Sequence, residues 1–228
     1  MPSPKPASRH VPSGAAPASA RKRQATGVIR VLKGVYPDAT CELSFSTPLE
    51  LLVATILSAQ CTDVRVNQVT ATLFQKYRTA EDFARADQAE LEEEVHPAGF
   101  FRQKAFSIRR TALKLVEEHA GEVPKQMEAL LQLPGVARKT ANVVLGTAYG
   151  IASGVVVDTH VKRLAFRMGL TDESDPEKVE RDLMAVVPKR DWVWFSHAMI
   201  WHGRRICFAR RPGCAICPLA DTCPKRGV

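Results

Sequence analysis

The C-terminal end of the chain concentrates cysteine to a degree that restricts how this region can fold. Four of the six cysteines fall within seventeen residues: Cys207, Cys214, Cys217 and Cys223. Disulfide-stapled secreted domains are shorter and spread their bridges through the fold. The sequence therefore predicts a reducing compartment and a closed four-thiolate metal site, with a structural role, that ties this end of the chain together.

The spacing leaves the identity of the metal open. Zinc favours paired Cys-x-x-Cys units, and only Cys214 and Cys217 form one. Iron–sulfur clusters accept four thiolates from more irregular loops. The longest interval contains Arg210 and Arg211 and no acidic residue, so we expect these two side chains to contact phosphate.

The chain from Thr26 onward is typical of an all-α protein, because no alternating run of β-branched residues is long enough for a strand. Thr47-Pro48-Leu49-Glu50 is a capping box before an apolar run, and Asp63 is expected to cap the next helix. Further helices are expected over 80–86, 88–95, 101–119, 127–133, 139–149, 158–167, 176–187 and 191–202.

Residues 1–24 are rich in proline, serine and alanine and carry basic but no acidic side chains. Such a segment buries too little apolar surface to offset its ordering entropy, so we predict a disordered basic arm that touches phosphates. An organelle transit peptide is the alternative. The net charge of +8 favours a polyanionic partner, nucleic acid first and a membrane surface second, and no apolar run is long enough to span a bilayer.

Leu133-Pro134-Gly135-Val136-Ala137-Arg138-Lys139 predicts a helix–hairpin–helix. Gly135 permits a turn with positive φ, and Val136 is expected to point into the core. The backbone N–H groups of Gly135, Val136, Ala137 and the next helix start would then form a phosphate site. A purely structural turn is the alternative.

Two side chains nearby are candidates for chemistry. Lys139 lies at the positive end of the helix dipole, which favours a free amine able to attack C1′ of a sugar; a phosphate-contacting lysine is equally compatible. Asp158, in Val157-Asp158-Thr159-His160, is either a helix N-cap or a carboxylate that stabilises a positively charged sugar.

Together, L-P-G-V-A-R-K-T-A-N-V-V, V-D-T-H and C-x6-C-x2-C-x5-C, spread over 26–223, resemble the bacterial endonuclease III family of DNA glycosylases. The resemblance implies two helical domains around a DNA-binding cleft. A six-helix domain would span 41–151, and a cluster domain would combine 25–40 with 152–228. It also implies a [4Fe–4S] cluster on the four C-terminal cysteines.

The family's nucleophilic lysine falls on Lys139 and its catalytic aspartate on Asp158. Gln60, in Leu57-Ser58-Ala59-Gln60-Cys61-Thr62-Asp63, would fill the hole left by a flipped nucleotide. Phe100, in Gly99-Phe100-Phe101, would be a second wedge, where the family often has leucine. Ala137 replaces a second hairpin glycine, at a cost of about 1 kcal/mol if that backbone needs a positive φ and little otherwise.

The implied function is base excision repair. The protein would remove oxidised pyrimidines from duplex DNA through a lysine Schiff base and cut the strand by β-elimination. Its partner would be double-stranded DNA with damaged pyrimidines or abasic sites. We expect a monomer without membrane association, in the cytoplasm and on the nucleoid of a bacterium.

Three alternatives remain. A mismatch adenine glycosylase generally lacks this lysine and has an extra C-terminal domain. The other two are a non-catalytic iron–sulfur DNA-binding protein and a zinc-module binder. The preferred lesion among oxidised pyrimidines, uracil and mismatches does not follow from the sequence.

Overall fold

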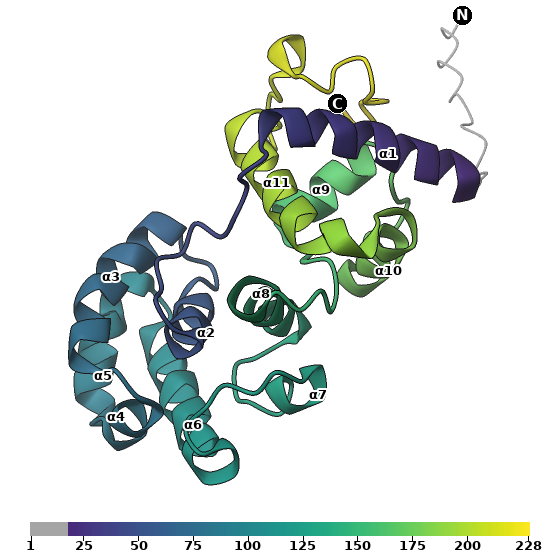
Figure 1. Ribbon diagram of the computed structural model, residues 1–228. Helices are drawn as coiled ribbons and strands as arrows, with labels where there is room; N and C mark the ends of the chain where they lie inside the picture. Colours follow the sequence, from purple (N-terminus) through teal and green to yellow (C-terminus); the bar gives the residue numbers. More distant parts are fainter. Residues whose placement is uncertain (1–17) are drawn as a thin grey trace, which may run out of the picture.

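The computed structural model describes residues 18–228 and forms two helical lobes (Figure 1). The α-helices are α1 Ala18–Val35, α2 Pro48–Leu57, α3 Asp63–Lys76, α4 Ala80–Arg85, α5 Gln88–Val95, α6 Phe101–His119, α7 Met127–Leu130, α8 Arg138–Tyr149, α9 Thr159–Arg167, α10 Pro176–Val186 and α11 Trp192–Arg205. Three 3-10 turns are also present: η1 His96–Ala98 and η2 Lys189–Asp191 lie between α-helices, and η3 Cys214–Ile216 follows α11. The described part of the chain has no strand, which confirms the all-α prediction.

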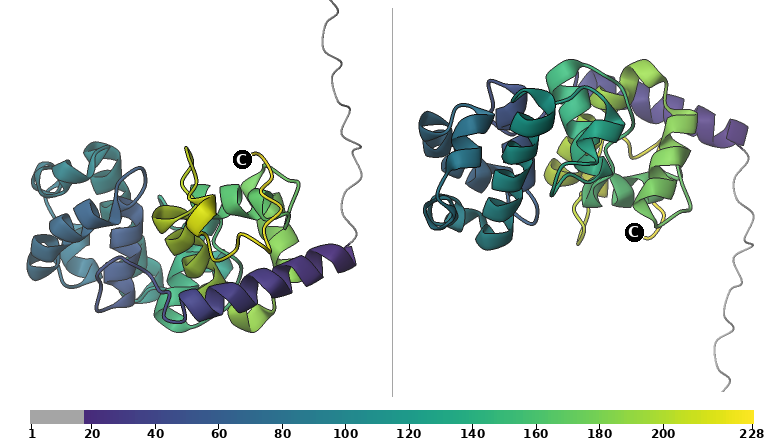
Figure 2. Two further views of the ribbon diagram at one scale, coloured as in Figure 1. Left: turned by 90° about the horizontal axis from the view of Figure 1, so that it is seen from above. Right: turned by 90° about the horizontal axis from the view of Figure 1, so that it is seen from below.

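Each lobe has its own hydrophobic core. The first core consists of buried residues from Leu43 to Leu145, which come from α2 to α8 and their connections. The second combines α1 with α9, α10 and α11 and reaches Leu219 near the C-terminus. Helices far apart in sequence therefore share one core, as the two views of Figure 2 also show. The buried residues of the first core lie between positions 43 and 145, and those of the second core lie on either side of that range.

The prediction of disorder over 1–24 is wrong for residues 18–24, which belong to α1. Residues 1–17 lie outside the described part. Helix α1 is held because Ala25, Val28 and Leu32 form a buried stripe at helical spacing. Gln24 adds a 2.8 Å hydrogen bond from its side chain to the Thr222 carbonyl. The proline-rich composition of the first residues led to a prediction of disorder that also covered the first turns of an amphipathic helix.

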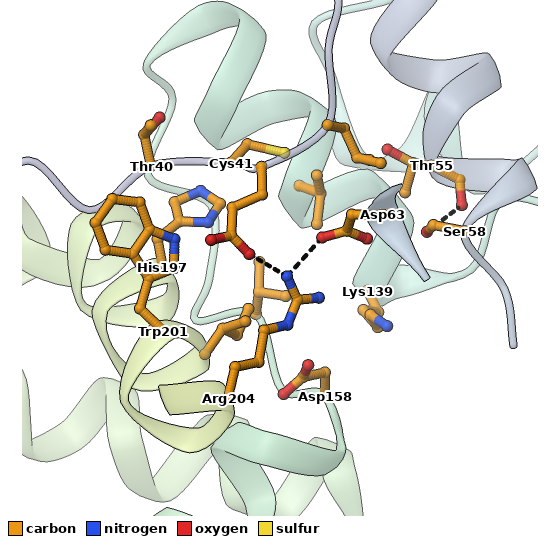
Figure 3. A pocket seen from close by; sticks show the side chains of 15 residues that line it. Thr40, Cys41, Thr55, Ser58, Asp63, Lys139, Asp158, His197, Trp201 and Arg204 are labelled. Atoms are coloured by element: carbon orange, nitrogen blue, oxygen red, sulfur yellow. Dashed lines mark hydrogen bonds and ion pairs between the residues drawn. The ribbon is translucent and has the colours of Figure 1, made fainter. Parts of the chain in front are cut away.

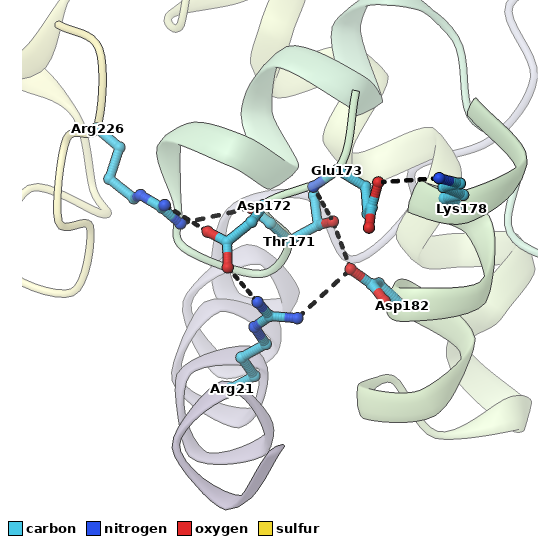
Figure 4. A network of polar contacts seen from close by, with 7 residues as sticks. All are labelled: Arg21, Thr171, Asp172, Glu173, Lys178, Asp182 and Arg226. Atoms are coloured by element: carbon cyan, nitrogen blue, oxygen red, sulfur yellow. Dashed lines mark hydrogen bonds and ion pairs between the residues drawn. The ribbon is translucent and has the colours of Figure 1, made fainter. Parts of the chain in front are cut away.

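A polar network fastens the first turns of α1 to the rest of the second lobe (Figure 4). Arg21 forms ion pairs with Asp172 and Asp182, and Arg226 pairs with the same Asp172 from the C-terminal segment. Thr171 donates to Asp182 at 2.5 Å. Both ends of the described chain thus meet at the loop between α9 and α10.

The predicted cap of α2 is present, whereas that of α3 is shifted by one residue. Thr47 accepts the Glu50 N–H at 3.1 Å, and the Glu50 carboxylate accepts from Ser46. Thr62, not Asp63, caps α3, by accepting the Arg65 N–H at 3.3 Å. Asp63 is the first helical residue, and its carboxylate pairs with a side chain of the other lobe.

Helix α8 lies at the junction of the two lobes (Figure 1). Its first turn is joined to α10 by Glu180, which accepts from Arg138 Nε at 2.7 Å and from Asn142 Nδ2 at 2.8 Å. A Cβ at position 154 would lie 2.0 Å from this carboxylate, so Gly154 leaves the room it needs. The junction fixes the start of α8 relative to the second lobe.

No helix within residues 18–228 is long and apolar enough to cross a membrane.

The placement of α1 makes a prediction about stability. Leu32 is fully buried, whereas Val35 at the end of the same helix is 40% exposed. Leu32→Ala is expected to lower the unfolding free energy by about 2–5 kcal/mol because it leaves a cavity. Val35→Ala is the matched control and should change it by about 0.5 kcal/mol or less. Thermal unfolding followed by circular dichroism compares the two, and equal melting temperatures would mean that α1 does not belong to the core.

Candidate active site and metal centre

The hairpin between α7 and α8 has the backbone that the sequence predicted. Gly135 has φ +77°, and a Cβ there would lie 2.9 Å from the Ser107 Cβ. Val136 is 6% exposed and packs in the first core. Thr111 donates to the Pro134 carbonyl at 2.6 Å and holds the turn on α6. The turn requires glycine for both its φ and its space.

The phosphate site of the hairpin differs from the prediction in one respect. The Val136 N–H donates to the Leu133 carbonyl at 3.1 Å, so it is already paired within the turn. Val136 therefore anchors the hairpin instead of presenting its amide. The described backbone contacts include no hydrogen bond from the N–H groups of Gly135, of Ala137 or of the first turn of α8. These are the groups that an anion can reach.

Ala137 is compatible with the hairpin. It is the exposed N-cap of α8 with φ −89° and ψ 170°, which is extended backbone that any residue adopts. The cost considered for a positive φ therefore does not arise. No side chain caps the helix at this position, which leaves the first-turn amides open.

Lys139 and Asp158 line one cavity of about 80 Å³ between the lobes. Lys139 is exposed and projects from the first turn of α8. Asp158 is half-buried and caps α9, where its Oδ1 accepts the Val161 N–H at 2.8 Å. Figure 3 shows the two side chains beside each other at the same side of the pocket. The N-cap interpretation of Asp158 is correct, and it leaves the second carboxylate oxygen free for the pocket.

Three charged groups of this pocket had no predicted role in it, since Asp63 was expected only as a helix cap and the other two were not singled out. Arg204 forms ion pairs with Glu42 and, at 2.7 Å, with Asp63 (Figure 3). Burial opposes the charge of Arg204, but hydrogen bonds to Asp63 and Glu42 outweigh it and raise the pKa of the guanidinium. The partners lie 141 and 162 positions away in sequence, so no local pattern could have paired them.

His197 forms part of the pocket wall. Burial lowers the pKa of this imidazole to about 4, so the ring is neutral near pH 7. Its Nε2 lies 3.3 Å from the Thr147 hydroxyl of α8. The ring thus provides a second contact between α8 and the second lobe, in addition to the one made by Glu180.

Gln60 and Phe100 occupy exposed loop tips of the first lobe. Both have left-handed backbones, with φ 53° and 48°. Phe100 is 66% exposed, which excludes a core role. Few non-glycine residues adopt this conformation without local support.

The four C-terminal cysteines line a second cavity together with Arg167, His202 and Leu219. Three nitrogen atoms lie near the sulfur atoms: Arg167 Nη1 is 3.3 Å from Cys207, and His202 Nε2 and the Lys225 amide are 3.4 Å from Cys217 and Cys223. Arginine and amide donors suit sulfur atoms that carry negative charge. The donor set therefore fits a group bound by four thiolates.

Within residues 18–228, no three His, Cys, Asp or Glu side chains are close enough together to hold a metal ion. Arg210 and Arg211, in the loop between the first two cysteines, are exposed and form no ion pair with any described residue.

Comparisons with known proteins agree with this geometry. Residues 53–189, more than half of the chain, match the family described as HhH-GPD superfamily base excision DNA repair protein. Endonuclease III of Synechocystis sp. is 57% identical over 206 residues, which cover 90% of this chain and 94% of that protein.

Two solved structures share the fold with a TM-score of 0.85. A non-covalent endonuclease III–DNA complex is 43% identical and matches 90% of this chain and 95% of its own. A trapped endonuclease III–DNA covalent intermediate is 42% identical and matches 90% and 96%. The chain therefore belongs to the HhH-GPD superfamily and, within it, to the endonuclease III family of bifunctional base excision repair glycosylase/AP lyases.

The hairpin geometry predicts opposite outcomes at its two small residues. Gly135→Ala should lower the unfolding free energy by at least about 1–2 kcal/mol, because alanine is strained at positive φ and meets the buried Ser107. Ala137→Gly should change it by no more than about 0.5 kcal/mol, because the backbone there is already extended. Melting temperatures measure both, and a clear gain from Ala137→Gly would contradict the assigned backbone.

Proposed function

We propose that this enzyme excises oxidised pyrimidines from duplex DNA with Lys139 as nucleophile and Asp158 as electrostatic partner. The observation that carries the proposal is that these two side chains come from different lobes and line one pocket. An exposed amine that caps no helix and joins no described ion pair is free to react. The trapped covalent intermediate of the related endonuclease III agrees with a covalent route.

The chemistry follows from these positions. The damaged nucleotide rotates out of the stack, because its reacting atom is out of reach in a duplex, and unpairing costs less for a damaged base. The Lys139 amine attacks C1′ while the bond from C1′ to the base breaks and the base leaves with the electron pair. Asp158 stabilises the positive charge that develops on the sugar. The amine loses a proton, and the sugar ring opens to give a Schiff base.

Strand cleavage requires no further reagent. The Schiff base acidifies the C2′ proton, and loss of that proton expels the 3′ phosphate by β-elimination. Water then hydrolyses the imine and restores the free lysine. The pocket side chains Glu42, Asp63 and Arg204 offer hydrogen bonds to a flipped base, which suits a polar, oxidised pyrimidine.

Contacts to DNA would come from both lobes. The open amides at the hairpin and the first turn of α8 fit a phosphate, and Arg210 and Arg211 fit a second part of the backbone. Gln60 and Phe100 would enter the duplex at the lesion. We propose that the protein acts as a monomer, with the domains divided at 40/41 and 151/152, and that in a bacterial cell it works on the nucleoid.

We assign a [4Fe–4S] cluster to Cys207, Cys214, Cys217 and Cys223. Such a cluster would supply structure, because these four cysteines would hold it through their thiolates. Arg167 joins the sulfur of Cys207 to the carbonyls of Phe208, at 2.7 Å, and Ala209, at 3.0 Å. It thereby links the cluster site to the loop that presents Arg210 and Arg211.

Borohydride trapping tests the nucleophile. With duplex DNA containing thymine glycol, the wild type should form a stable protein–DNA adduct. Lys139→Gln should abolish the adduct and strand cleavage while binding persists. Asp158→Asn keeps the N-cap but removes the charge, and base release should slow by roughly 10²-fold or more. An adduct formed by Lys139→Gln would assign the chemistry to another amine. A normal rate of base release by Asp158→Asn would mean that Asp158 acts only as a helix N-cap, which contributes about 1 kcal/mol to stability.

Metal analysis tests the cofactor. Protein purified without oxygen should be brown and contain iron and acid-labile sulfide in equal amounts. Cys217→Ser should lower both, because a hydroxyl replaces a thiolate ligand, whereas Cys61→Ser in the first lobe should leave them unchanged. Zinc without iron would refute the cluster and favour a zinc module.

A further inference from the structure

Lys104 is a buried lysine in the first turn of α6 that the proposed mechanism does not use. Its side chain is 5% exposed, although lysine is almost never fully buried unless it is paired. Burial lowers the pKa of its amine. Within residues 18–228 no carboxylate forms an ion pair with it. Its partners are two backbone carbonyls, Leu57 O at 2.8 Å and Ala98 O at 2.9 Å.

Both carbonyls end a helix. Leu57 is the last residue of α2 and Ala98 the last of η1, and the two residues are 0% and 3% exposed. No backbone N–H of the described chain donates to either oxygen. Without the Lys104 amine, two buried carbonyls at the negative ends of helices would be unsatisfied. One amine thus completes the ends of two separate helices.

Each of these helix ends leads directly into a candidate wedge. Gln60 follows Leu57 by three residues, and Phe100 follows Ala98 by two. Both wedge residues have positive φ, a conformation that persists only where the surrounding structure holds it. The two loops are otherwise carried by different helices, so their separation depends on what connects the two ends.

We propose that Lys104 is a positioning residue that holds the Gln60 and Phe100 loops at the separation needed for both side chains to enter the duplex at one lesion. The inference rests on the proposed DNA role of Gln60 and Phe100. A hydrogen-bonded amine between two carbonyls is a short connection, and displacement of a positioned group by about 1 Å can cost up to roughly 10²-fold in rate. Loss of the connection would let the loops move independently.

The experiment compares two DNA substrates under single-turnover conditions. One is a fully paired duplex with thymine glycol, and the other carries the same lesion within a bubble of unpaired bases, where wedges have little to open. Lys104→Met removes the donors and keeps the side-chain length. It should slow base release from the paired duplex by about 10-fold or more and from the bubble by about 3-fold or less. Lys104→Arg, which keeps a cation and its donors, should largely restore the wild-type ratio.

Ile108→Ala is the matched control. Ile108 lies one turn further along α6, is 1% exposed and contacts the same core. It should lower the melting temperature while leaving the ratio of the two rates unchanged, because it does not connect the loops. If Lys104→Met slows both substrates equally, as a general loss of stability would, the positioning role is overturned. Lys104→Gln provides the same comparison if the methionine variant does not fold.

A double-mutant cycle separates this inference from the function on which it rests. In a Gln60→Ala/Phe100→Ala background, Lys104→Met should have little further effect on the paired duplex, because its action passes through those side chains. A full additional loss in that background overturns the positioning role alone. If Gln60→Ala/Phe100→Ala itself does not slow the paired duplex relative to the bubble, the wedge assignment fails, and the inference about Lys104 fails with it.

Discussion

The polar junction between α8 and the second lobe is the constraint on which the site depends. Glu180 is buried and accepts from Arg138 and Asn142, so it determines how the first turns of α8 lie against α10. Lys139 follows Arg138 directly and takes its position from that junction. Asp158 belongs to the other lobe. The contact between the lobes therefore sets the distance between Lys139 and Asp158, although neither side chain takes part in that contact.

A second interlobe contact lies inside the pocket itself. Arg204 of α11 reaches two carboxylates, those of Glu42 and Asp63, which flank the first lobe's α2 region. These side chains are only partly buried, so solvent screens their attraction and the ion pairs add little net stability, but an arrangement that separates them leaves a partly desolvated charge without its partner. The network thus favours one relative position of the lobes and contributes little to the stability of the folded protein. The same charges give the pocket walls a polar character.

The cavity lined by the four C-terminal cysteines places a similar constraint on the C-terminal loop. The chain after α11 has little regular structure of its own, and its cysteines surround a cavity together with Arg167 of α9. The loop with Arg210 and Arg211 therefore depends on the cysteines and on the Arg167 contacts for its shape. A short loop held at both ends can present charge to DNA without a helix beneath it.

The sequence by itself determined the local features. Helical periodicity and capping residues predicted most helices to within a few residues, and Gly135 predicted the positive φ of the hairpin, because these properties depend on neighbours along the chain. The resemblance to a family added the proposed wedge roles of Gln60 and Phe100 and the proposed catalytic roles of Lys139 and Asp158, which local patterns left ambiguous. The helix over 18–24 was missed, because its apolar stripe begins only at Ala25 and is stabilised by the distant Thr222 and Asp172.

Only the tertiary structure decided how distant groups meet. Three contacts join residues more than forty positions apart: Arg204 with Glu42, Arg138 with Glu180, and Lys104 with Leu57. The second contact of Lys104, to Ala98, is local. No periodicity encodes such pairs, since they arise from the packing of whole lobes. The structure also showed that Ala137 is extended and that the Val136 amide is occupied, because backbone conformation at one residue depends on the turn around it.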